Sequence, residues 1–440
     1  MSLNRRDFLR RAAGVASAAA LTGQSPLASV QTESLPPPAD SGIEHIVVVM
    51  MENRSFDHLL GWLPGANGQQ AGLAYLDNKG EAHPTHRLTT FVGCSHPDPD
   101  HSYTGGRSEY DDGKMDGWLR TTTNDVFSIG YYEEADLPFF SALARNYTTL
   151  DNYFASILGP TFPNRIFQHA AQTDRISNTI ELCTLPTIWD NLAAAGVSSK
   201  YYYSNVPFLA FWGAKYLGIS ALFSDFLADA AAGTLPSVSF VDPRFTLIDD
   251  GLGNDDHPHA DLRAGEAFLG QVYKAVTNGP GWKNTVLIIN RDEWGGFFDT
   301  VVPPRVVPAN DVDTDLVDGN VLLGCRVPVV VVSPFSAGKP ATPRIDSSLY
   351  DHTSVLKLIE WRYSLPSLTL RDASNQIANL ALALNFQAVY TPPPTLPKVN
   401  QPFPTPCGLF ELGSEVDNES YDFLKLLVSD LVSGWKTLGL

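Results

Sequence analysis

This 440-residue sequence lacks long apolar runs, since the stretch rich in alanine near its N-terminus is short and no later run is long enough for a membrane helix. Even VPVVVVSPF at 327–335 falls short of the roughly 18 apolar residues that a membrane-spanning helix needs. Positive charge is also scarce, because 30 Lys and Arg stand against 48 Asp and Glu. The net charge of -18 disfavours nucleic-acid binding and lasting attachment to an anionic membrane. We therefore expect a soluble chain with no nucleic-acid partner and only transient contact with a membrane surface.

Cysteine is the next scarcity, with only four residues and no C-x-x-C pair. This spacing excludes a zinc ribbon. One or two disulfides are compatible with it in an oxidising compartment, and so are buried free thiols. The sequence leaves the pairing open among Cys94, Cys183, Cys325 and Cys407.

The N-terminus carries the pattern of an export signal. Arg5 and Arg6 precede Phe8, Leu9 and a short stretch rich in alanine and glycine. This order predicts a twin-arginine signal at 1–28, a linker at 29–42 and one domain at 43–440. A basic N-terminal tail is the alternative. With the signal, the Tat export machinery would carry a folded, metal-loaded chain to the periplasm or the medium.

Hydrophobic residues make up 44% of the chain and fall into alternating strand and helix patterns. Near-continuous apolar runs predict strands at 45–51, 237–242, 284–290 and 325–335. Helical patterns lie at 138–147, 187–196, 261–279 and 352–365, and a final helix is expected near 419–436. Strands that alternate with helices predict a three-layer α/β fold with a mostly parallel sheet between helices. The stretches 62–135 and 202–235 show no clear period and are interpreted as long loop insertions, while the proline-rich tail at 387–408 should wrap the surface.

Polar side chains follow two of the predicted strands at the point where each strand ends. Glu52 and Asn53 follow the first strand, and Asp292 and Glu293 follow the strand at 284–290. Ligands of open α/β sheets bind outside the carboxyl ends of the strands. An oxygen-rich set at that edge predicts a site for one divalent metal ion, of which Ca, Mg, Mn and Zn all remain open. Each acid alone is equally compatible with a helix cap or a salt bridge.

A candidate nucleophile lies in LGPTFPNR at 158–165. Gly159 and Pro160 predict a tight turn with Thr161 at its apex, and Pro163 suits the first position of a helix. A hydroxyl at a helix start lies near free N–H groups that bind phosphate oxygens, and contact with a metal would activate it. The alternative is an ordinary threonine N-cap.

Histidines at loop-to-helix junctions complete the candidate set. His101, His257 and His352 are interpreted as proton donors or phosphate ligands, with Asp256 and Asp351 orienting the rings of the last two. Loop histidines that only contact solvent are the alternative.

The motifs MENRSFDH, DPDH, KMDGW, GPTFPNR, DDHPHADLRAGEAF, DEWGGFFD and DHTS follow one another in order from about residue 43 to 385. In this order they resemble the bacterial phosphoesterase family, which holds phospholipases C of the nonhemolytic type, plant nonspecific phospholipases C and a related acid phosphatase. The resemblance implies an alkaline-phosphatase-like fold. It also implies metal ligands at Glu52, Asn53, Asp292 and Glu293, a phosphorylated nucleophile at Thr161, and phosphate-binding and proton-transfer positions at His101, Asp256, His257 and His352.

A threonine nucleophile is typical of the phospholipases C, whereas the acid phosphatase carries serine. The expected function is therefore cleavage of the glycerol-side phosphodiester of a phospholipid, with phosphatidylcholine as the expected substrate, through a phosphothreonine. A phosphomonoesterase acting on small phosphoesters and a noncatalytic phosphate- or metal-binding protein are the alternatives. Two family histidines are replaced by Trp294 and Thr300, which leaves headgroup choice open. Trp118, Tyr131, Tyr132 and the run Tyr201–Tyr203 offer either a choline cage or core packing.

Overall fold

The structure is a computed structural model that describes residues 35–246, 252–339, 341–390, 392–404 and 407. The predicted signal segment at 1–28 and the predicted final helix near 419–436 lie outside these residues, as do residues 29–34 of the linker.

An eight-stranded sheet forms the centre of the fold, in the order β15-β6-β14-β10-β1-β9-β7-β8. β1 lies in its interior and pairs in parallel with β9 and β10, while β14 runs antiparallel to β10 and β6. The sheet is thus mostly parallel, as predicted. The strands are β1 (His45–Met51), β6 (Thr148–Leu150), β7 (Ser199–Tyr203), β8 (Ser220–Leu222), β9 (Val238–Val241), β10 (Thr285–Arg291), β14 (Val329–Val332) and β15 (Arg344–Asp346).

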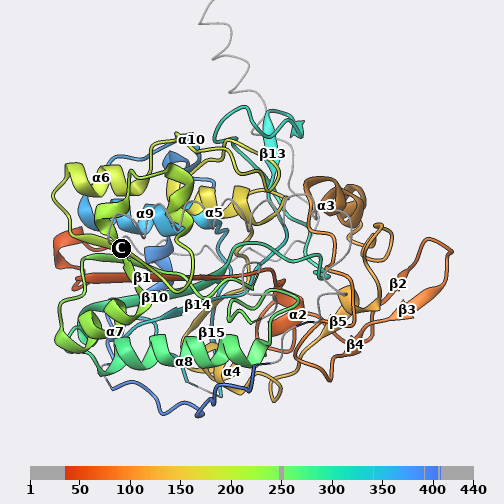
Figure 1. Ribbon diagram of the computed structural model, residues 1–440, viewed down its shortest axis with the longest axis horizontal. Helices are drawn as coiled ribbons and strands as arrows, with labels where there is room; N and C mark the ends of the chain where they lie inside the picture. Colours follow the sequence, from red (N-terminus) through yellow and green to blue (C-terminus); the bar gives the residue numbers. More distant parts are fainter. Residues whose placement is uncertain (1–34, 247–251, 340, 391, 405–406, 408–440) are drawn as a thin grey trace, which may run out of the picture. The chain divides into compact units, whose positions relative to one another are not determined.

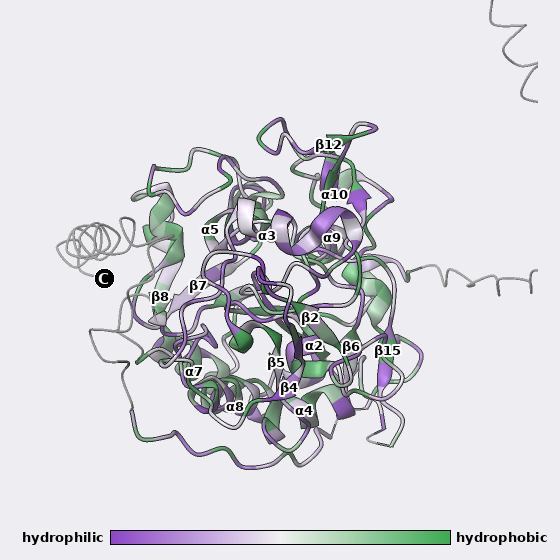
Figure 2. Ribbon diagram, turned by 90° about the vertical axis from the view of Figure 1, so that its right-hand side faces the viewer, coloured by the Kyte–Doolittle hydropathy of each residue, from purple (hydrophilic) through white to green (hydrophobic). Residues whose placement is uncertain are grey.

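Helices cover both faces of the sheet (Figure 1). One face carries α5 (Thr161–Ala170), α6 (Ile188–Ala194) and α9 (His352–Tyr363). The other carries α4 (Pro138–Asn146), α7 (Phe223–Ala232) and α8 (Leu262–Asn278). Successive residues of β1 from Ile46 point into the two cores in turn, which explains why its sequence is apolar from Ile46 to Met51. In the view of Figure 2, β7 and β8 lie toward one edge of the sheet and β15 toward the other. The three-layer α/β prediction is confirmed.

Shorter elements gather beyond the carboxyl end of β1, including α2 (Phe56–Leu60) and α3 (Tyr103–Tyr110) (Figure 1). The remaining elements are β2 (Ala74–Leu76), β3 (Ala82–Pro84), β4 (His86–Arg87), β5 (Gly130–Tyr131), β11 (Arg305–Val306), β12 (Leu316–Val317), β13 (Asn320–Leu322), α10 (Leu370–Ala373), and 3₁₀ helices at Pro38–Asp40, Asp111–Gly113, Val126–Ile129, Phe208–Trp212, Leu217–Ile219, Trp282–Asn284 and Leu380–Ala383.

Two local predictions are wrong. The stretch 202–235 is no loop insertion, because it contains the end of β7, all of β8 and α7. Three-residue strands are too short to show a period, so the pattern gave no sign of them. Helix α5 begins at Thr161, two residues before Pro163. A proline fits this first turn because its missing N–H would have no partner within the helix.

The cysteine pairing that the sequence left open is resolved. Cys94 and Cys407 form a disulfide across a sequence separation of 313 residues, and Cys183 and Cys325 are free and buried. The proline-rich tail runs back over the fold, where Tyr273 of α8 donates a hydrogen bond to the carbonyl of Pro394 (3.1 Å). Within the described ranges, no helix is long and apolar enough to cross a membrane.

Candidate active site

The four strand-end residues lie together because β1 and β10 are parallel neighbours with Met51 opposite Arg291. The residues that follow the two strands therefore meet at one edge of the sheet. One oxygen of Asp292 accepts hydrogen bonds from the backbone N–H groups of Asn53 (3.1 Å) and Glu293 (2.7 Å). Glu52, Asn53, Asp292 and Glu293 are all fully buried.

Burial disfavours the charged form of these acids. It raises the pKa of Glu52 well above the usual range and that of Glu293 to about 8, and the carboxylate of Asp292 adds to both shifts. Three buried oxygens of these four residues have no hydrogen-bond partner in the described part of the chain: Glu52 Oε2, Asn53 Oδ1 and Glu293 Oε1. Buried polar atoms without partners are rare in folded proteins. Hard oxygen atoms from two carboxylates and an amide are suitable ligands for a divalent cation, so the residues fit the predicted ion.

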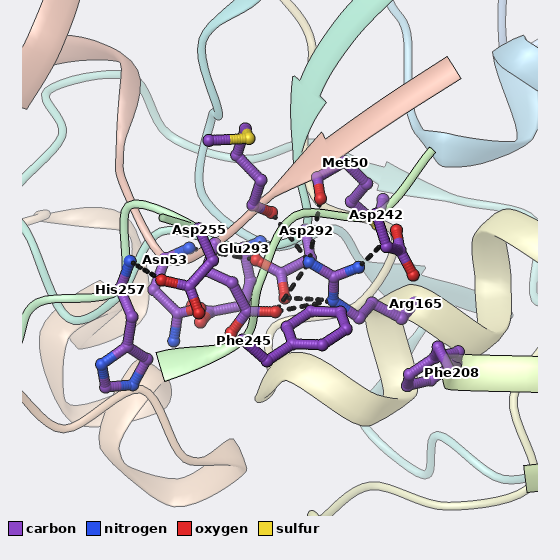
Figure 3. Close-up of polar contacts among 12 residues, drawn as sticks. Met50, Asn53, Arg165, Phe208, Asp242, Phe245, Asp255, His257, Asp292 and Glu293 are labelled. Atoms are coloured by element: carbon purple, nitrogen blue, oxygen red, sulfur yellow. Dashed lines mark hydrogen bonds and ion pairs between the residues drawn. The ribbon is translucent and has the colours of Figure 1, made fainter. Parts of the chain in front are cut away.

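Arg165 of α5 forms ion pairs with two of these acids. Its guanidinium lies 2.6 Å from Glu52 Oε1, and its Nε lies 3.2 Å from Asp292 Oδ2 (Figure 3). Thr161 lies one helical turn before Arg165, on the same face of α5, and is buried. Asn164 holds the turn before Thr161 in place, because its amide donates to the carbonyls of Gly159 (2.8 Å) and Pro160 (3.2 Å). Thr161 thus begins a helix whose next turn is anchored to the strand-end acids.

His352, the first residue of α9, contacts the same edge. Its Nε2 donates to the backbone carbonyl of Asp292 (2.6 Å), and its Nδ1 accepts from the hydroxyl of Tyr153 (3.1 Å). Burial lowers the pKa of His352 to about 4, so the ring is neutral. The prediction that Asp351 orients this ring is wrong. The Asp351 carboxylate caps α9 at Thr353 and pairs with Arg371.

His101 and His257 stand near each other, with ring centroids 6.4 Å apart. His101 donates through Nδ1 to the carbonyl of Pro99 (2.7 Å), and its Nε2 lies 3.3 Å from the side-chain amide of Asn53. The Nε2 of His257 lies 3.4 Å from the carboxylate of Asp98, which is partly exposed. Burial lowers the pKa of His257 to about 3. Asp98 is therefore the acid that orients His257.

The prediction that Asp256 orients His257 is wrong. Its backbone has a positive φ of 76°, and its carboxylate accepts a hydrogen bond from Arg291 (2.7 Å). Arg54 binds the backbone carbonyls of Asp256 (2.7 Å) and His257 (3.2 Å) and so fixes the loop. The left-handed backbone turns neighbouring side chains in different directions, which sequence adjacency cannot show. A role of Asp256 in phosphate binding stays a prediction.

Trp294 and Thr300, at the two positions where the resemblance implies histidines, make structural contacts, and Trp294 is buried while Thr300 is partly buried. The indole N–H of Trp294 donates to Glu109 (2.7 Å), and the hydroxyl of Thr300 donates to Asp57 (2.5 Å). The aromatic residues considered for a choline cage are buried in packing contacts; they are Trp118, Tyr131, Tyr132, Tyr201, Tyr202 and Tyr203.

Sequence reasoning missed three charged residues of this site: Arg165, Asp98 and Asp242. Arg165 ends the quoted motif GPTFPNR, four residues after Thr161, which is the spacing of one helical face. Asp98 lies in the DPDH motif with His101. Asp242 follows strand β9 directly, so the strand-end rule that selected Glu52 and Asp292 also applied to it.

A second group of possible metal ligands lies in the β2–β3 hairpin. One ligand atom from each of Asp77, Glu81 and His83 falls within 4.8 Å of the others. Glu81 is exposed and the other two are only partly buried. The hairpin therefore lacks the buried, unpartnered oxygens that distinguish the strand-end set.

Comparison with known proteins assigns this site to a family. The model of the phosphoesterase family matches residues 43–366. Phospholipase C B of Mycobacterium tuberculosis is 32% identical over 477 residues, covering 91% of this chain and 88% of the relative. Non-specific phospholipase C6 of Arabidopsis thaliana is 31% identical over 373 residues, covering 76% and 71%.

Among solved structures, a protein in the alkaline phosphatase superfamily from Vibrio parahaemolyticus is similar, with 9% identity and a TM-score of 0.39. The matched region covers 77% of this chain and 69% of that one. The family match contains every predicted site residue from Glu52 to His352. The chain therefore belongs to the phosphoesterase family and is a hydrolase.

Proposed function

We propose that this protein is an exported, metal-dependent phospholipase C that cleaves the glycerol-side phosphodiester of a phospholipid, with phosphatidylcholine as the expected substrate. The observation that carries the proposal is the set of three buried, unpartnered oxygens on Glu52, Asn53 and Glu293 beside the helix of Thr161. The relatives support the choice of reaction, because those named above are phospholipases C.

The residues of the chain supply the chemical steps. The Thr161 hydroxyl attacks phosphorus in line, and the bond to the diacylglycerol oxygen breaks. One of the site histidines, His101, His257 or His352, takes up the proton that Thr161 loses and passes it to the leaving diacylglycerol oxygen. Water then cleaves the phosphothreonine and releases the phosphorylated headgroup. His352 also donates a hydrogen bond to the backbone carbonyl of Asp292 and so holds that strand end in place.

Glu52, Asn53, Asp292 and Glu293 would hold the divalent ion. When bound, it would lower the pKa of the Thr161 hydroxyl and neutralise charge on the phosphoryl oxygens. Arg165 supplies a fixed positive charge at the same acids. Arg165 and the ion together would therefore balance the negative charge of the three buried carboxylates.

The proposal places the protein outside the cytoplasm. The twin-arginine pattern at 1–28 supports export through the Tat machinery to the periplasm or the medium. The net charge of -18 supports only transient contact with an anionic membrane and no nucleic-acid partner.

Turnover of p-nitrophenyl phosphorylcholine and p-nitrophenyl phosphate by the purified protein tests the proposal. We expect kcat/KM to be higher for the diester. A clear preference for the monoester would replace the phospholipase by a phosphatase that uses the same site. Phosphate binding without turnover of either compound would indicate a noncatalytic protein.

A further inference from the structure

The guanidinium of Arg165 is held from every side, so its orientation is set by its partners. Its Nε donates to Glu52 (2.7 Å) and its Nη2 to the backbone carbonyls of Met50 (3.1 Å) and Met51 (3.2 Å). Its Nη1 donates to Asp242 Oδ1 (3.3 Å), and the ring of Phe245 covers the group with its centroid 4.6 Å away (Figure 3). Arg165 is almost completely buried, and each of its three nitrogens donates to at least one partner. Arg165 is therefore a fixed internal charge.

Asp242 links Arg165 to the far edge of the sheet. It follows β9, is almost completely buried, and its second oxygen accepts a hydrogen bond from the hydroxyl of Tyr201. The same hydroxyl accepts from the backbone N–H of Phe208 (2.7 Å), so the tyrosine is itself anchored. A continuous chain of contacts thus runs from Tyr201 through Asp242 and Arg165 to Glu52.

We infer that Asp242 and Tyr201 are positioning residues that keep Arg165 turned so that Glu52 Oε2 stays available to the divalent ion. The inference rests on the proposed function, because it assigns the free oxygen to that ion. Asp242 binds Nη1, whereas Nε and Nη2 contact Glu52 Oε1 and leave Glu52 Oε2 without a partner among the described residues. Without it, the guanidinium can turn toward Glu52 Oε2, and a hydrogen bond to that oxygen would compete with a cation for it.

Two substitutions separate charge from orientation. Asp242→Asn removes a negative charge and weakens the contact with Arg165, so it lowers cation affinity by both effects. Tyr201→Phe keeps every charge and removes only the hydroxyl that aligns Asp242. Tyr202→Phe is the matched control, because Tyr202 lies on the same strand but donates to Asp229 (2.6 Å) on the opposite side.

The experiment titrates the full mature protein and each variant with Mn²⁺ by calorimetry and measures kcat and KM on p-nitrophenyl phosphorylcholine. Substitution of a residue that holds a metal ligand in place typically lowers metal affinity by about 10–100-fold. We therefore expect Mn²⁺ affinity to fall within that range for Asp242→Asn and by about 3–10-fold for Tyr201→Phe. kcat should fall in the same order with KM nearly constant, and Tyr202→Phe should match the wild type. Thermal unfolding of each variant checks that the fold is retained.

Mn²⁺ affinities within about twofold of the wild type for both Asp242→Asn and Tyr201→Phe would overturn the inference, as would equal weakening in Tyr202→Phe. A wild type that binds no Mn²⁺ would overturn it as well. If the wild type binds Mn²⁺ but cleaves neither nitrophenyl compound, the proposed function fails, and the affinities of the variants alone decide the positioning role.

Discussion

Two buried clusters of this protein are built from the same kinds of residue, an arginine between acids, but differ in how completely their oxygens are bonded. Arg165 lies between Glu52 and Asp292, and Arg326 lies between Asp57 and Asp299. All of these side chains are buried.

The Arg326 cluster is closed, because each oxygen of its two aspartates accepts at least one hydrogen bond. Asp57 accepts from the backbone of Gln69 (2.9 Å) and from Thr300, and Asp299 accepts from Arg326 Nε at Oδ1 (2.9 Å) and from Arg326 Nη2 at Oδ2 (3.3 Å).

The Arg165 cluster is open, because Glu52 Oε2 and Glu293 Oε1 have no partner among the described residues. A buried ion pair alone is therefore no sign of function, since buried charges need partners in any fold. The grouping of unpartnered oxygens on Glu52, Asn53 and Glu293 at one edge of the sheet is what distinguishes the open cluster, among the described residues, as a candidate site.

The largest expected effect concerns Thr161, which begins the helix of the open cluster. Thr161→Ala should lower kcat about a thousandfold or more, because it removes the hydroxyl that attacks phosphorus. Thr161→Ser should keep partial activity. The matched control is Thr300→Ala in the closed cluster, which should cost about 1 kcal/mol of unfolding free energy and leave kcat unchanged. Steady-state assays and denaturant unfolding measure both, and a Thr161→Ala variant with near-normal turnover would refute the nucleophile.

Removal of divalent ions should abolish activity without unfolding the chain. The open cluster would lose its ligand, whereas the two hydrophobic cores and the closed cluster depend on no ion. Chelator treatment followed by assay and circular dichroism tests this, and added divalent ions should restore the rate. Full activity in thoroughly demetallated protein would contradict the metal site.

Substitution of the two arginines compares the clusters directly. Arg165→Met and Arg326→Met should each lower the unfolding free energy by about 3–5 kcal/mol, because each leaves buried carboxylates without their cation. Added Mn²⁺ should recover part of the loss in Arg165→Met, since it can neutralise Glu52, and none in Arg326→Met. Denaturant unfolding with and without Mn²⁺ measures the difference. Equal recovery in both variants would remove the distinction between open and closed clusters.

The smallest effect tests burial of a carboxyl group that, among the described residues, forms no ion pair. Burial raises the pKa of Glu266 in α8 from 4.5 to about 7, and its carboxylate accepts from the backbone of Phe140 (2.7 Å). The folded state then binds the proton more tightly than the unfolded chain, so stability falls as the pH rises through this window.

Glu266→Gln keeps the acceptor and removes the titration. Between pH 4.5 and 7 the wild type should therefore lose about 2–3 kcal/mol of unfolding free energy more than the variant. Urea unfolding at pH 5 and pH 8 measures this. Parallel pH profiles of the two proteins would show that Glu266 does not titrate as described.

Local sequence patterns determined the layers of the fold and one part of the site. Strand β1 lies within the predicted limits, because six consecutive apolar residues covered on both faces leave a clear pattern. Glu52 and Asp292 could be placed together from sequence, because parallel strands end at the same edge of a sheet. The short strand β8 and helix α7 could not be predicted, since their positions depend on packing against β7.

Only the tertiary structure decided which charged groups meet. Arg165 contacts Glu52 and Asp292 across 113 and 127 residues of chain, and Cys94 pairs with Cys407 across 313. His257 pairs with Asp98 and not with its neighbour Asp256, because the backbone at Asp256 turns that carboxylate toward Arg291. Periodicity and motif spacing describe neighbours along the chain, whereas hydrogen bonds and ion pairs depend on distances in space. The sequence alone therefore predicted the acids of the site, and folding determined which of their oxygens are left without a partner.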